Sequence, residues 1–427
     1  MRILIATINR NLVGGVEKYL HGLIPSLQER GHEVVLLHEN RPDPRLMNVD
    51  PAARPIQTWC VAEIGLAAAL QSASQWKPGI VYSHGLESAS LEGALLEAYP
   101  TVLYAHNYYG TCPTGRKCHA FPNARPCDRT IGPACLLLHY PRRCGGWNPA
   151  TMWSMYQRQS QLNSRLMKFQ NILVASHHMY REFRQNGVSA EKLELIPLPA
   201  TDSAPLLDPP VPKRPDGRLL FVGRLTDLKG VHYLIEAVPQ AAEILGRNLR
   251  LVIAGDGPER QRLQELAQRL GIAPDFRGWV STSQKVELMR QADLLVVPSL
   301  WPEPFALVGI EAGCLGLPAA GYAVGGIPDW LHPGQTGEHA SGDPPTVRGL
   351  AEAIAKALGD PDRYMDLCRG AWENSKRFTL REHLARLEPV LGGPSSNRPL
   401  PAQTLSALRT PACLPVSEMC GGDPNVS

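Results

Sequence analysis

Short apolar runs alternate with helical patterns along most of this 427-residue chain, and glycines stand where several of the runs end. A run at residues 3–6 leads through Gly14 and Gly15 into a segment whose apolar residues recur at helical spacing. Gly31 ends that segment, and a buried strand is expected at residues 33–37. Because strand–helix alternation of this kind produces a parallel sheet covered by helices, the chain is expected to be an α/β protein.

The alternation occurs in two series, separated by a proline-rich joint between Pro197 and Pro212. The strands expected in the first series are at 80–82, 102–104 and 172–174, and those in the second are at 219–223, 250–255 and 294–297. A joint without periodic pattern is typical of a domain boundary. The sequence therefore predicts two Rossmann-like domains facing a central cleft, at residues 1–198 and 199–375.

Two further segments follow the second domain. We expect residues 376–392 to form a C-terminal helix that returns to the first domain. Residues 393–427 are rich in Pro, Ser and Gly and lack periodicity, so a disordered tail is expected there.

Composition excludes several classes of protein. The chain has 43 basic and 40 acidic residues, a net charge of +3, so nucleic acid is not the expected partner. No stretch of about 18 uncharged apolar residues occurs, so no transmembrane helix is expected. The apolar run at residues 3–6 is too short for a secretory leader. A cytoplasmic protein is expected, and peripheral association with a membrane remains open.

Two carboxylates bracket an apolar helix that is expected to open near Phe305. Glu303 lies just before the helix and Glu311 lies about two turns inside it. The first turn of a helix has free backbone amides and a partial positive charge, which suit a phosphate. Glu311 stands between Ile310 and Ala312, and a buried carboxylate normally has a partner, such as a ribose diol. Acidic residues at helix starts also serve as simple caps, so this alternative stays open.

Two cations and several glycines stand at other strand exits. Arg224 and Lys229 flank the turn after the strand at 219–223, where they suit a pyrophosphate that must be neutralised as it leaves. Gly255 and Gly257 follow one strand of the second series, and the pair at 325–326 follows another. Glycine allows backbone amides to approach a phosphate closely, but it equally serves tight turns.

The ordered set of 223–230, 255–258 and 303–311 resembles glycosyltransferase family 4, the group 1 transferases. The resemblance extends over most of residues 1–390. It implies the GT-B fold, two Rossmann-like domains facing a cleft, and transfer of a sugar with retention of its anomeric configuration. It also implies a nucleoside-diphosphate sugar as donor, most simply a hexose donor, and no required metal cofactor. The turn at 195–202 departs from the family's asparagine–glycine turn at this crossing.

The resemblance also implies a role for each matching residue. Arg224 and Lys229 would bind the donor diphosphate, Glu311 would hold the ribose, and Glu303 would lie beside the donor sugar. His106 matches a histidine that the family places near the sugar. The remaining donor-binding positions implied in this way are Gly14, Gly15, Gly257, Phe305, Ala306, Leu307 and Val308.

Five cysteines crowd into the segment at residues 108–149, which follows His106 and is expected to be an insertion. They are Cys112, Cys118, Cys127, Cys135 and Cys144. Three interpretations are open: a zinc or iron–sulfur site, disulfide bonds, or thiols packed in a long loop. Thiolates suit these metals, but structural zinc sites usually show tighter cysteine pairs.

Loops at strand exits often carry specificity, so the insertion is expected to shape the acceptor pocket. Its candidate acceptor contacts are Tyr108, Tyr109, Arg116, Lys117, Arg142 and Arg143. The acceptor itself stays open between a glycan, a lipid and a small molecule. Alternative functions are a nucleotide-sugar epimerase and a metal- or redox-responsive binding protein on the same scaffold.

Overall fold

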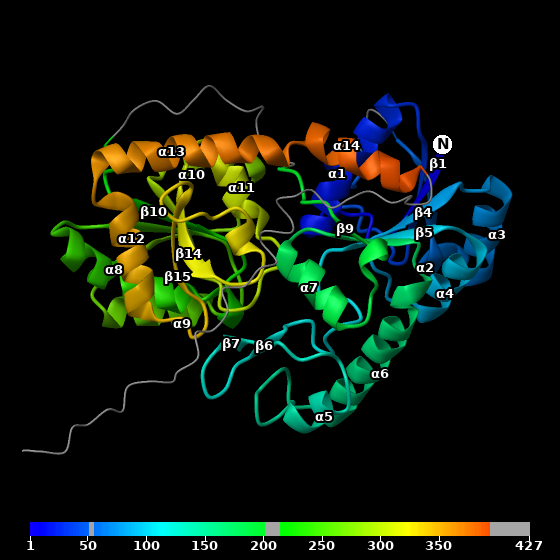
Figure 1. The fold of residues 1–427 in the computed structure, drawn as a ribbon, viewed down its shortest axis with the longest axis horizontal. Helices are drawn as coiled ribbons and strands as arrows, with labels where there is room; N and C mark the ends of the chain where they lie inside the picture. Colours follow the sequence, from blue (N-terminus) through cyan, green and yellow to red (C-terminus); the bar gives the residue numbers. More distant parts are fainter. Residues whose placement is uncertain (51–54, 201–213, 393–427) are drawn as a thin grey trace, which may run out of the picture. The chain divides into compact units, whose positions relative to one another are not determined.

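Two parallel β-sheets, with the helices that connect their strands, account for most of the structure (Figure 1). This is a computed structural model, and it describes residues 1–50, 55–200 and 214–392. Both sheets belong to one compact unit, and the tail expected at 393–427 lies outside the described residues. The domain boundaries proposed above therefore stay predictions. None of the helices in the described ranges combines the length and apolar character needed to cross a bilayer.

The first sheet has seven strands in the order β3-β2-β1-β4-β5-β8-β9, and every neighbouring pair is parallel. Its strands are β1 (Arg2–Thr7), β2 (Glu33–His38), β3 (Gln57–Cys60), β4 (Ile80–Ser83), β5 (Thr101–Ala105), β8 (Asn171–Val174) and β9 (Leu193–Leu195). The helices of this part are α1 (Gly15–Glu29), α2 (Val61–Ile64), α3 (Leu66–Trp76), α4 (Ala89–Ala98), α5 (Ala134–Leu138), α6 (Pro149–Arg165) and α7 (His177–Gln185). Between β5 and α5, an antiparallel hairpin joins β6 (Cys118–His119) and β7 (Arg125–Pro126).

The second sheet has six strands in the order β12-β11-β10-β13-β14-β15, again all parallel. Its strands are β10 (Arg218–Val222), β11 (Arg250–Ala254), β12 (Asp275–Gly278), β13 (Leu294–Val297), β14 (Ala319–Ala323) and β15 (Gly337–Ser341). The helices are α8 (Val231–Leu245), α9 (Arg260–Arg269), α10 (Thr282–Gln291), α11 (Leu307–Gly313), α12 (Val347–Leu358), α13 (Pro361–Ser375) and α14 (Leu380–Leu391). The strand order changes direction between β1 and β4 in the first sheet and between β10 and β13 in the second. Ligands of open α/β sheets usually bind at such a point, outside the carboxyl ends of the strands.

The helix predicted after Gly14 and Gly15 is α1, and it packs as its apolar period requires. Its buried apolar side chains are Tyr19, Leu20, Leu23, Ile24 and Leu27. Gly31 follows the helix with φ 81°, a left-handed conformation that favours glycine. The capping box predicted at Ser281 and Gln284 is likewise confirmed at the start of α10.

The strands expected from apolar runs are confirmed to within two residues, but the four edge strands of the two sheets were missed. They are β3, β9, β12 and β15. β12 reads Asp-Phe-Arg-Gly, and none of its four residues is fully buried. Such strands lack a continuous apolar run because one side faces solvent, so the pattern used to find buried strands does not detect them.

Helix α14 lies alongside α1 in Figure 1 and is attached to the first sheet by a buried histidine. His383 Nε2 lies 2.7 Å from the hydroxyl of Tyr19, and its Nδ1 lies 2.8 Å from the carbonyl oxygen of Pro197. Tyr19 is in turn hydrogen-bonded to Tyr82 at 2.8 Å. The side chain of Arg30 on α1 also donates to Glu388 on α14 at 2.8 Å.

This attachment predicts a dependence of stability on pH. Burial lowers the pKa of His383 to about 4, so the unfolded chain binds a proton at this histidine before the folded protein does. As pH falls from about 6.5 toward 4, His383 should cost about 1.4 kcal/mol of stability per pH unit. In urea unfolding followed over that range, His383→Gln should therefore lose stability less steeply than the wild type. Equal slopes for the two proteins would contradict the buried neutral histidine.

Candidate active site

A cleft of about 370 Å³ lies at the carboxyl ends of the two sheets. From the first sheet it is lined by Gly15, Val16, His106 and Asn107. From the second it is lined by Phe221, Val222, Lys229, Val296, Val297, Ser299, Trp301 and Glu303, with the residues from Pro304 to Val308; Leu198 of the connecting chain completes it. This volume lies in the range of small-molecule sites.

The exit of β13 carries the most buried charge of the cleft. Glu303 is 5% exposed, and its Oε1 accepts hydrogen bonds from Lys229 Nζ at 2.6 Å and from Ser299 Oγ at 2.7 Å. Both donors reach Oε1, so neither of them occupies Oε2. A buried carboxylate normally has partners of this kind, since an unpaired charge is costly away from water. The structure therefore places the predicted Lys229 and Glu303 together on the cleft wall.

Lys229 reaches the cleft because of a tight turn after β10. Residues Asp227–Lys229 form a 3-10 turn, and Gly230 follows with φ 66°. A Cβ at Gly230 would lie 1.9 Å from the carbonyl oxygen of Pro298. Only glycine lets this turn approach the exit of β13 closely, and the approach brings Lys229 to Glu303.

The glycines at 325–326 hold the backbone of Glu303. A Cβ on Gly325, where φ is 59°, would lie 2.2 Å from the carbonyl oxygen of Glu303. Gly326 donates its amide to the same oxygen at 2.7 Å. This strand exit was considered above as a possible phosphate cradle, but these contacts give its glycines a structural role.

The helix expected to open near Phe305 begins at Leu307 instead. Ala306 precedes it in a left-handed conformation with φ 60°, and the helix, α11, has only seven residues. The turn before it is held by Trp330, whose indole Nε1 donates to the carbonyl oxygen of Phe305 at 2.7 Å. Residues 305–308 still line the cleft as expected.

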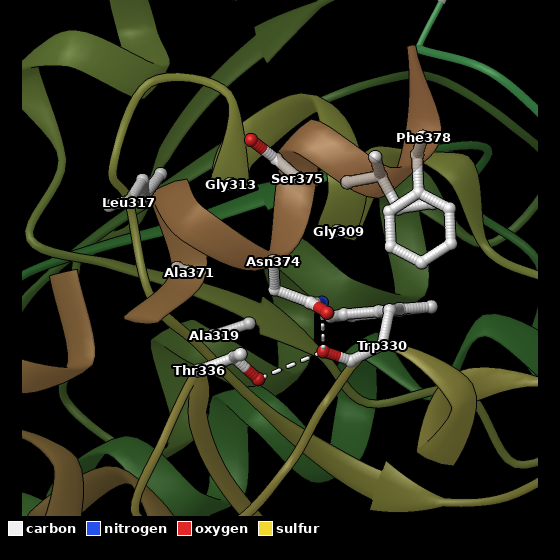
Figure 2. Close-up of a pocket in the computed structure, with 11 residues that line it drawn as sticks. Gly309, Gly313, Leu317, Ala319, Trp330, Thr336, Ala371, Asn374, Ser375 and Phe378 are labelled. Atoms are coloured by element: carbon white, nitrogen blue, oxygen red, sulfur yellow. Dashed lines mark hydrogen bonds between the residues drawn. The ribbon is translucent and has the colours of Figure 1, made fainter. Parts of the chain in front are cut away.

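Behind α11 lies a second, much smaller cavity of about 10 Å³ (Figure 2). Figure 2 shows Asn374 and Thr336 converging on the backbone oxygen of Trp330, at 3.2 and 2.9 Å. Gly309 sits against the ring of Trp330, where an added Cβ would lie 2.1 Å from a ring carbon. This cavity holds at most about one water molecule, so it serves the packing of α11 rather than ligand binding.

His106 lines the cleft with its imidazole backed by a second histidine. Its Nε2 lies 2.9 Å from Nδ1 of His84, and the Nε2 of His84 has no hydrogen-bond partner among the described residues. Burial, helped by the nearby His383, lowers the pKa of His106 to about 3. His106 is therefore neutral at physiological pH and acts as a hydrogen-bonding group rather than as a cation.

Four of the predicted residues do not line the cleft cavity: Gly14, Arg224, Gly257 and Glu311. Arg224 is exposed at the exit of β10. A Cβ at Gly257 would lie 2.4 Å from the carbonyl oxygen of Leu225, so this glycine permits two turns to touch. Glu311 accepts a hydrogen bond from Lys285 at 2.8 Å. The partner that its burial requires is therefore present in the protein itself.

Sequence reasoning missed two further residues of the cleft wall. Ser299 is 1% exposed and donates to Glu303, as described above. Trp301 has a buried indole Nε1 without a hydrogen-bond partner in the described part of the chain, and its ring lies 5.9 Å from Lys229 Nζ. Both residues stand in the strand exit that the sequence marked, but neither is charged, and charge was the signal used there.

The cysteine-rich insertion is anchored by a buried ion pair. Lys117, which is 2% exposed, places its Nζ 2.6 Å from Glu182 on α7. The five cysteines of the insertion are free thiols, and no three His, Cys, Asp or Glu side chains among the described residues are arranged to hold a metal ion. Burial raises the pKa of Cys118 to about 12 and that of Cys144 to about 11. The geometry thus offers no support for disulfides in this segment, and the metal hypothesis stays an untested prediction.

Half of the candidate acceptor contacts are buried. Tyr108 is 1% and Tyr109 7% exposed, and Lys117 is engaged as just described. Tyr108 donates to the carbonyl oxygen of Pro302 and bonds to His178 at 2.9 Å, so it fastens the insertion to the loop that carries Glu303. These three side chains are engaged inside the protein, and their contact with an acceptor stays a prediction. Arg116 reaches Asp227 at 2.5 Å, beside the Lys229 turn.

Comparison with known families covers both halves of the chain. The family described as Glycosyltransferase Family 4 matches residues 13–201, and the one described as Glycosyl transferases group 1 matches residues 209–374. Glycogen synthase of Mycobacterium tuberculosis is 26% identical over 407 residues, which cover 88% of this chain and 92% of that protein. The D-inositol 3-phosphate glycosyltransferase of Thermobispora bispora is 36% identical over 182 residues, 40% of this chain and 42% of that protein.

Solved structures of low sequence identity share the fold. Anabaena HepE, solved in complex with UDP-glucose, superimposes with a TM-score of 0.61 at 18% identity, over 96% of this chain and 100% of that one. Sucrose-phosphate synthase of Thermosynechococcus elongatus gives a TM-score of 0.65 at 19% identity, over 91% and 98%. These structures show the GT-B fold, with its two parallel sheets. The two family models together match residues 13–201 and 209–374, so the chain belongs to glycosyltransferase family 4, the group 1 transferases, and is a glycosyltransferase.

Proposed function

We propose that this enzyme transfers a sugar, most simply a hexose, from a nucleoside-diphosphate sugar to an acceptor with retention of anomeric configuration. The observation that carries the proposal is the cluster of Lys229, Glu303 and Ser299 on the wall of a cleft of about 370 Å³. That HepE was solved with UDP-glucose supports a nucleotide sugar as donor. Retention rests on the resemblance to the family.

The chemistry of such a transfer matches the charges of the cluster. As the bond between sugar and diphosphate breaks, negative charge grows on the leaving phosphate and positive charge grows on the sugar. A cation held beside the leaving group stabilises the first charge, and Lys229 occupies that role. The carboxylate of Glu303 stabilises the second charge or holds sugar hydroxyls. Arg224, exposed nearby on the same strand exit, is available to the diphosphate.

Neutral groups on the cleft wall complete the proposed site. Neutral His106 offers a hydrogen bond from the side of the first sheet. The ring of Trp301 also lines the cleft, 5.9 Å from Lys229 Nζ.

Product analysis with a panel of nucleotide sugars tests the proposal. The purified protein should release free nucleoside diphosphate from one donor of the panel, by slow hydrolysis or by transfer to an added acceptor. NMR of the product should show the same anomeric configuration as the donor. Inversion would contradict retention, and conversion of the donor into an epimer without release of diphosphate would favour the epimerase alternative.

The alternative of a metal- or redox-responsive binding protein has its own test. The insertion carries five cysteines within residues 108–149, which is the observation that keeps this alternative open. Elemental analysis after anaerobic purification should then find zinc or iron in stoichiometric amount. Metal-free protein that retains transferase activity would exclude it.

Glu311 is predicted to affect donor binding rather than the chemical step. Its carboxylate is paired with Lys285, so the neutral and nearly isosteric Glu311→Gln is preferable to alanine. If the carboxylate holds the ribose diol, Glu311→Gln should raise KM for the donor by about tenfold, the cost of one charged hydrogen bond. The value of kcat should change little. An unchanged KM would remove Glu311 from the donor site.

A further inference from the structure

The segment that contains α5 and α6 has an unusual charge composition. Residues 129–181 include no Asp or Glu, although the whole chain has 40 acidic residues against 43 basic ones. The basic residues of this segment are Arg129, Arg142, Arg143, Arg158, Arg165, Lys168 and Arg181. Two of these arginines face carboxylates of a neighbouring segment, Arg158 at 3.9 Å from Glu87 and Arg165 at 4.0 Å from Glu92, whereas Arg142 and Arg143 form no ion pair with a described residue. The remaining cations leave a local positive field that attracts anions.

The same segment exposes large apolar side chains. Leu137 on α5 is 78% exposed, Trp147 in the following loop is 69% exposed, and Trp153 in the first turns of α6 is 50% exposed. The tryptophans are supported by stacked neighbours: Tyr140 lies 6.0 Å from Trp147, and Tyr156 lies 6.2 Å from Trp153, between ring centroids. Exposed rings held in this way present a fixed apolar surface to solvent.

Arginines stand among these apolar side chains. Arg143 lies over the ring of Phe121, with 4.9 Å between its guanidinium and the ring centroid, and Phe121 is itself 47% exposed. Besides burial, the charges of Arg142 and Arg125 lower the pKa of His119, so several guanidinium groups surround one imidazole. Aromatic rings and arginines are thus interleaved on this part of the surface.

We infer that the face formed by Leu137, Arg142, Arg143, Trp147 and Trp153, called here the insertion face, docks on an anionic lipid surface. Tryptophan rings prefer the level of the lipid headgroups, and arginines pair with lipid phosphates. Leucine and tryptophan side chains that enter the acyl boundary leave water, which accounts for their exposure in the free protein. A soluble polyanion would satisfy the arginines but would leave Leu137 in water, so the lipid surface fits the face better.

The opposite side of the insertion meets the cleft. Arg116 bonds to Asp227 in the turn that carries Lys229, and the Sγ of Cys118 lies 3.7 Å from the carbonyl oxygen of Leu300. Docking through the insertion face would therefore bring the cleft close to the bilayer, where an acceptor carried by a lipid is located. This consequence rests on the proposed function, whereas the docking itself does not.

Co-sedimentation of the full chain with vesicles tests the docking. One set of vesicles contains phosphatidylcholine only, and the other contains about one third phosphatidylglycerol, a surface to which each nearby arginine adds attraction. We expect at least about tenfold stronger binding to the anionic vesicles, weakening as salt rises from 0.05 to 0.5 M because surface charges are screened. Each of the double variants Trp147→Ser/Trp153→Ser and Arg142→Ser/Arg143→Ser should bind the anionic vesicles severalfold more weakly than the wild type does at the same salt concentration.

Matched controls exist on the second sheet's side of the molecule. Trp279 is 76% exposed there, and the side chain of Arg369 is 67% exposed, so Trp279→Ser and Arg369→Ser should bind vesicles like the wild type. Circular dichroism of every variant checks that it is folded. The inference is overturned if anionic vesicles bind no protein, if the face variants bind as well as the controls, or if heparin binds the protein while vesicles do not. Donor hydrolysis, measured without vesicles, reports on the transferase function separately.

Discussion

Replacing Lys229 with alanine is expected to lower kcat by about 10²–10³-fold, the usual effect of removing one preorganised group that stabilises transition-state charge. The side chain of Lys229 donates to Glu303 at 2.6 Å at the edge of the cleft. In the proposed function its cation neutralises the departing diphosphate. Because charge on the leaving group is largest in the transition state, the loss should appear mainly in kcat, with a smaller rise in KM.

The controls for this variant separate charge from folding. Arg262 on α9 pairs with Glu259 at 2.8 Å, and its side chain is 65% exposed. Exposed pairs of this kind contribute little, so Arg262→Ala should leave kcat and stability almost unchanged. Lys229→Ala should lower the melting temperature, because the buried Glu303 then keeps only its bond to Ser299, but circular dichroism should still show the native fold. A kcat within threefold of the wild type would contradict the role assigned to Lys229.

Replacing Gly325 with alanine is expected to destabilise the protein by about 3 kcal/mol and to reduce activity at the same time. A left-handed conformation costs an L-residue about 1–2 kcal/mol. The new Cβ would lie 2.2 Å from the carbonyl oxygen of Glu303, so the backbone must also move. That movement displaces the carboxylate of Glu303 from Lys229, and geometric errors of about 1 Å in a catalytic site are expensive.

Gly271 provides the matched control for this substitution. It follows α9 with φ 67°, close to the 59° of Gly325, and a Cβ there would meet nothing within 4 Å. Gly271→Ala should therefore lose only the conformational cost of about 1–2 kcal/mol and keep full activity. The difference between the two variants in urea unfolding and in kcat isolates the contact with Glu303. Equal losses of stability in the two variants, with full activity in both, would show that this contact does not position the carboxylate.

The prediction for Lys229 could be made largely from the sequence, whereas the prediction for Gly325 required the structure. Lys229 and Glu303 were predicted from charge at strand exits and from the family resemblance, and the structure brings them to one wall of the cleft. The role of Gly325 was not predictable, because the contact of this glycine with Glu303 joins the exits of two different strands. A glycine in a phosphate loop and a glycine in a packed turn look the same in a sequence.

Glu311 and His106 also have properties that depend on partners elsewhere in the chain, which the sequence does not identify. The sequence indicated that Glu311 needs a partner, and only the structure shows that Lys285, on a different helix, already supplies one. His106 was predicted at the cleft, but its neutral state follows from burial against His84 and His383, which are distant in the chain. The insertion was recognised from its cysteines, whereas the exposure of Leu137 and Trp147 depends on how α5 and α6 pack.

The sequence by itself determined the α/β class, the buried strands and the family, and it indicated the strand exits at which a site is expected, because these follow from periodicity and from local motifs. The tertiary structure decided which exits meet. It pairs Lys229 with Glu303, places Gly325 behind that carboxylate, and leaves the insertion face open to solvent. The physical reason is that burial, ion pairing and close backbone contact are properties of segments far apart in the chain, and they exist only once the sheets and helices have packed.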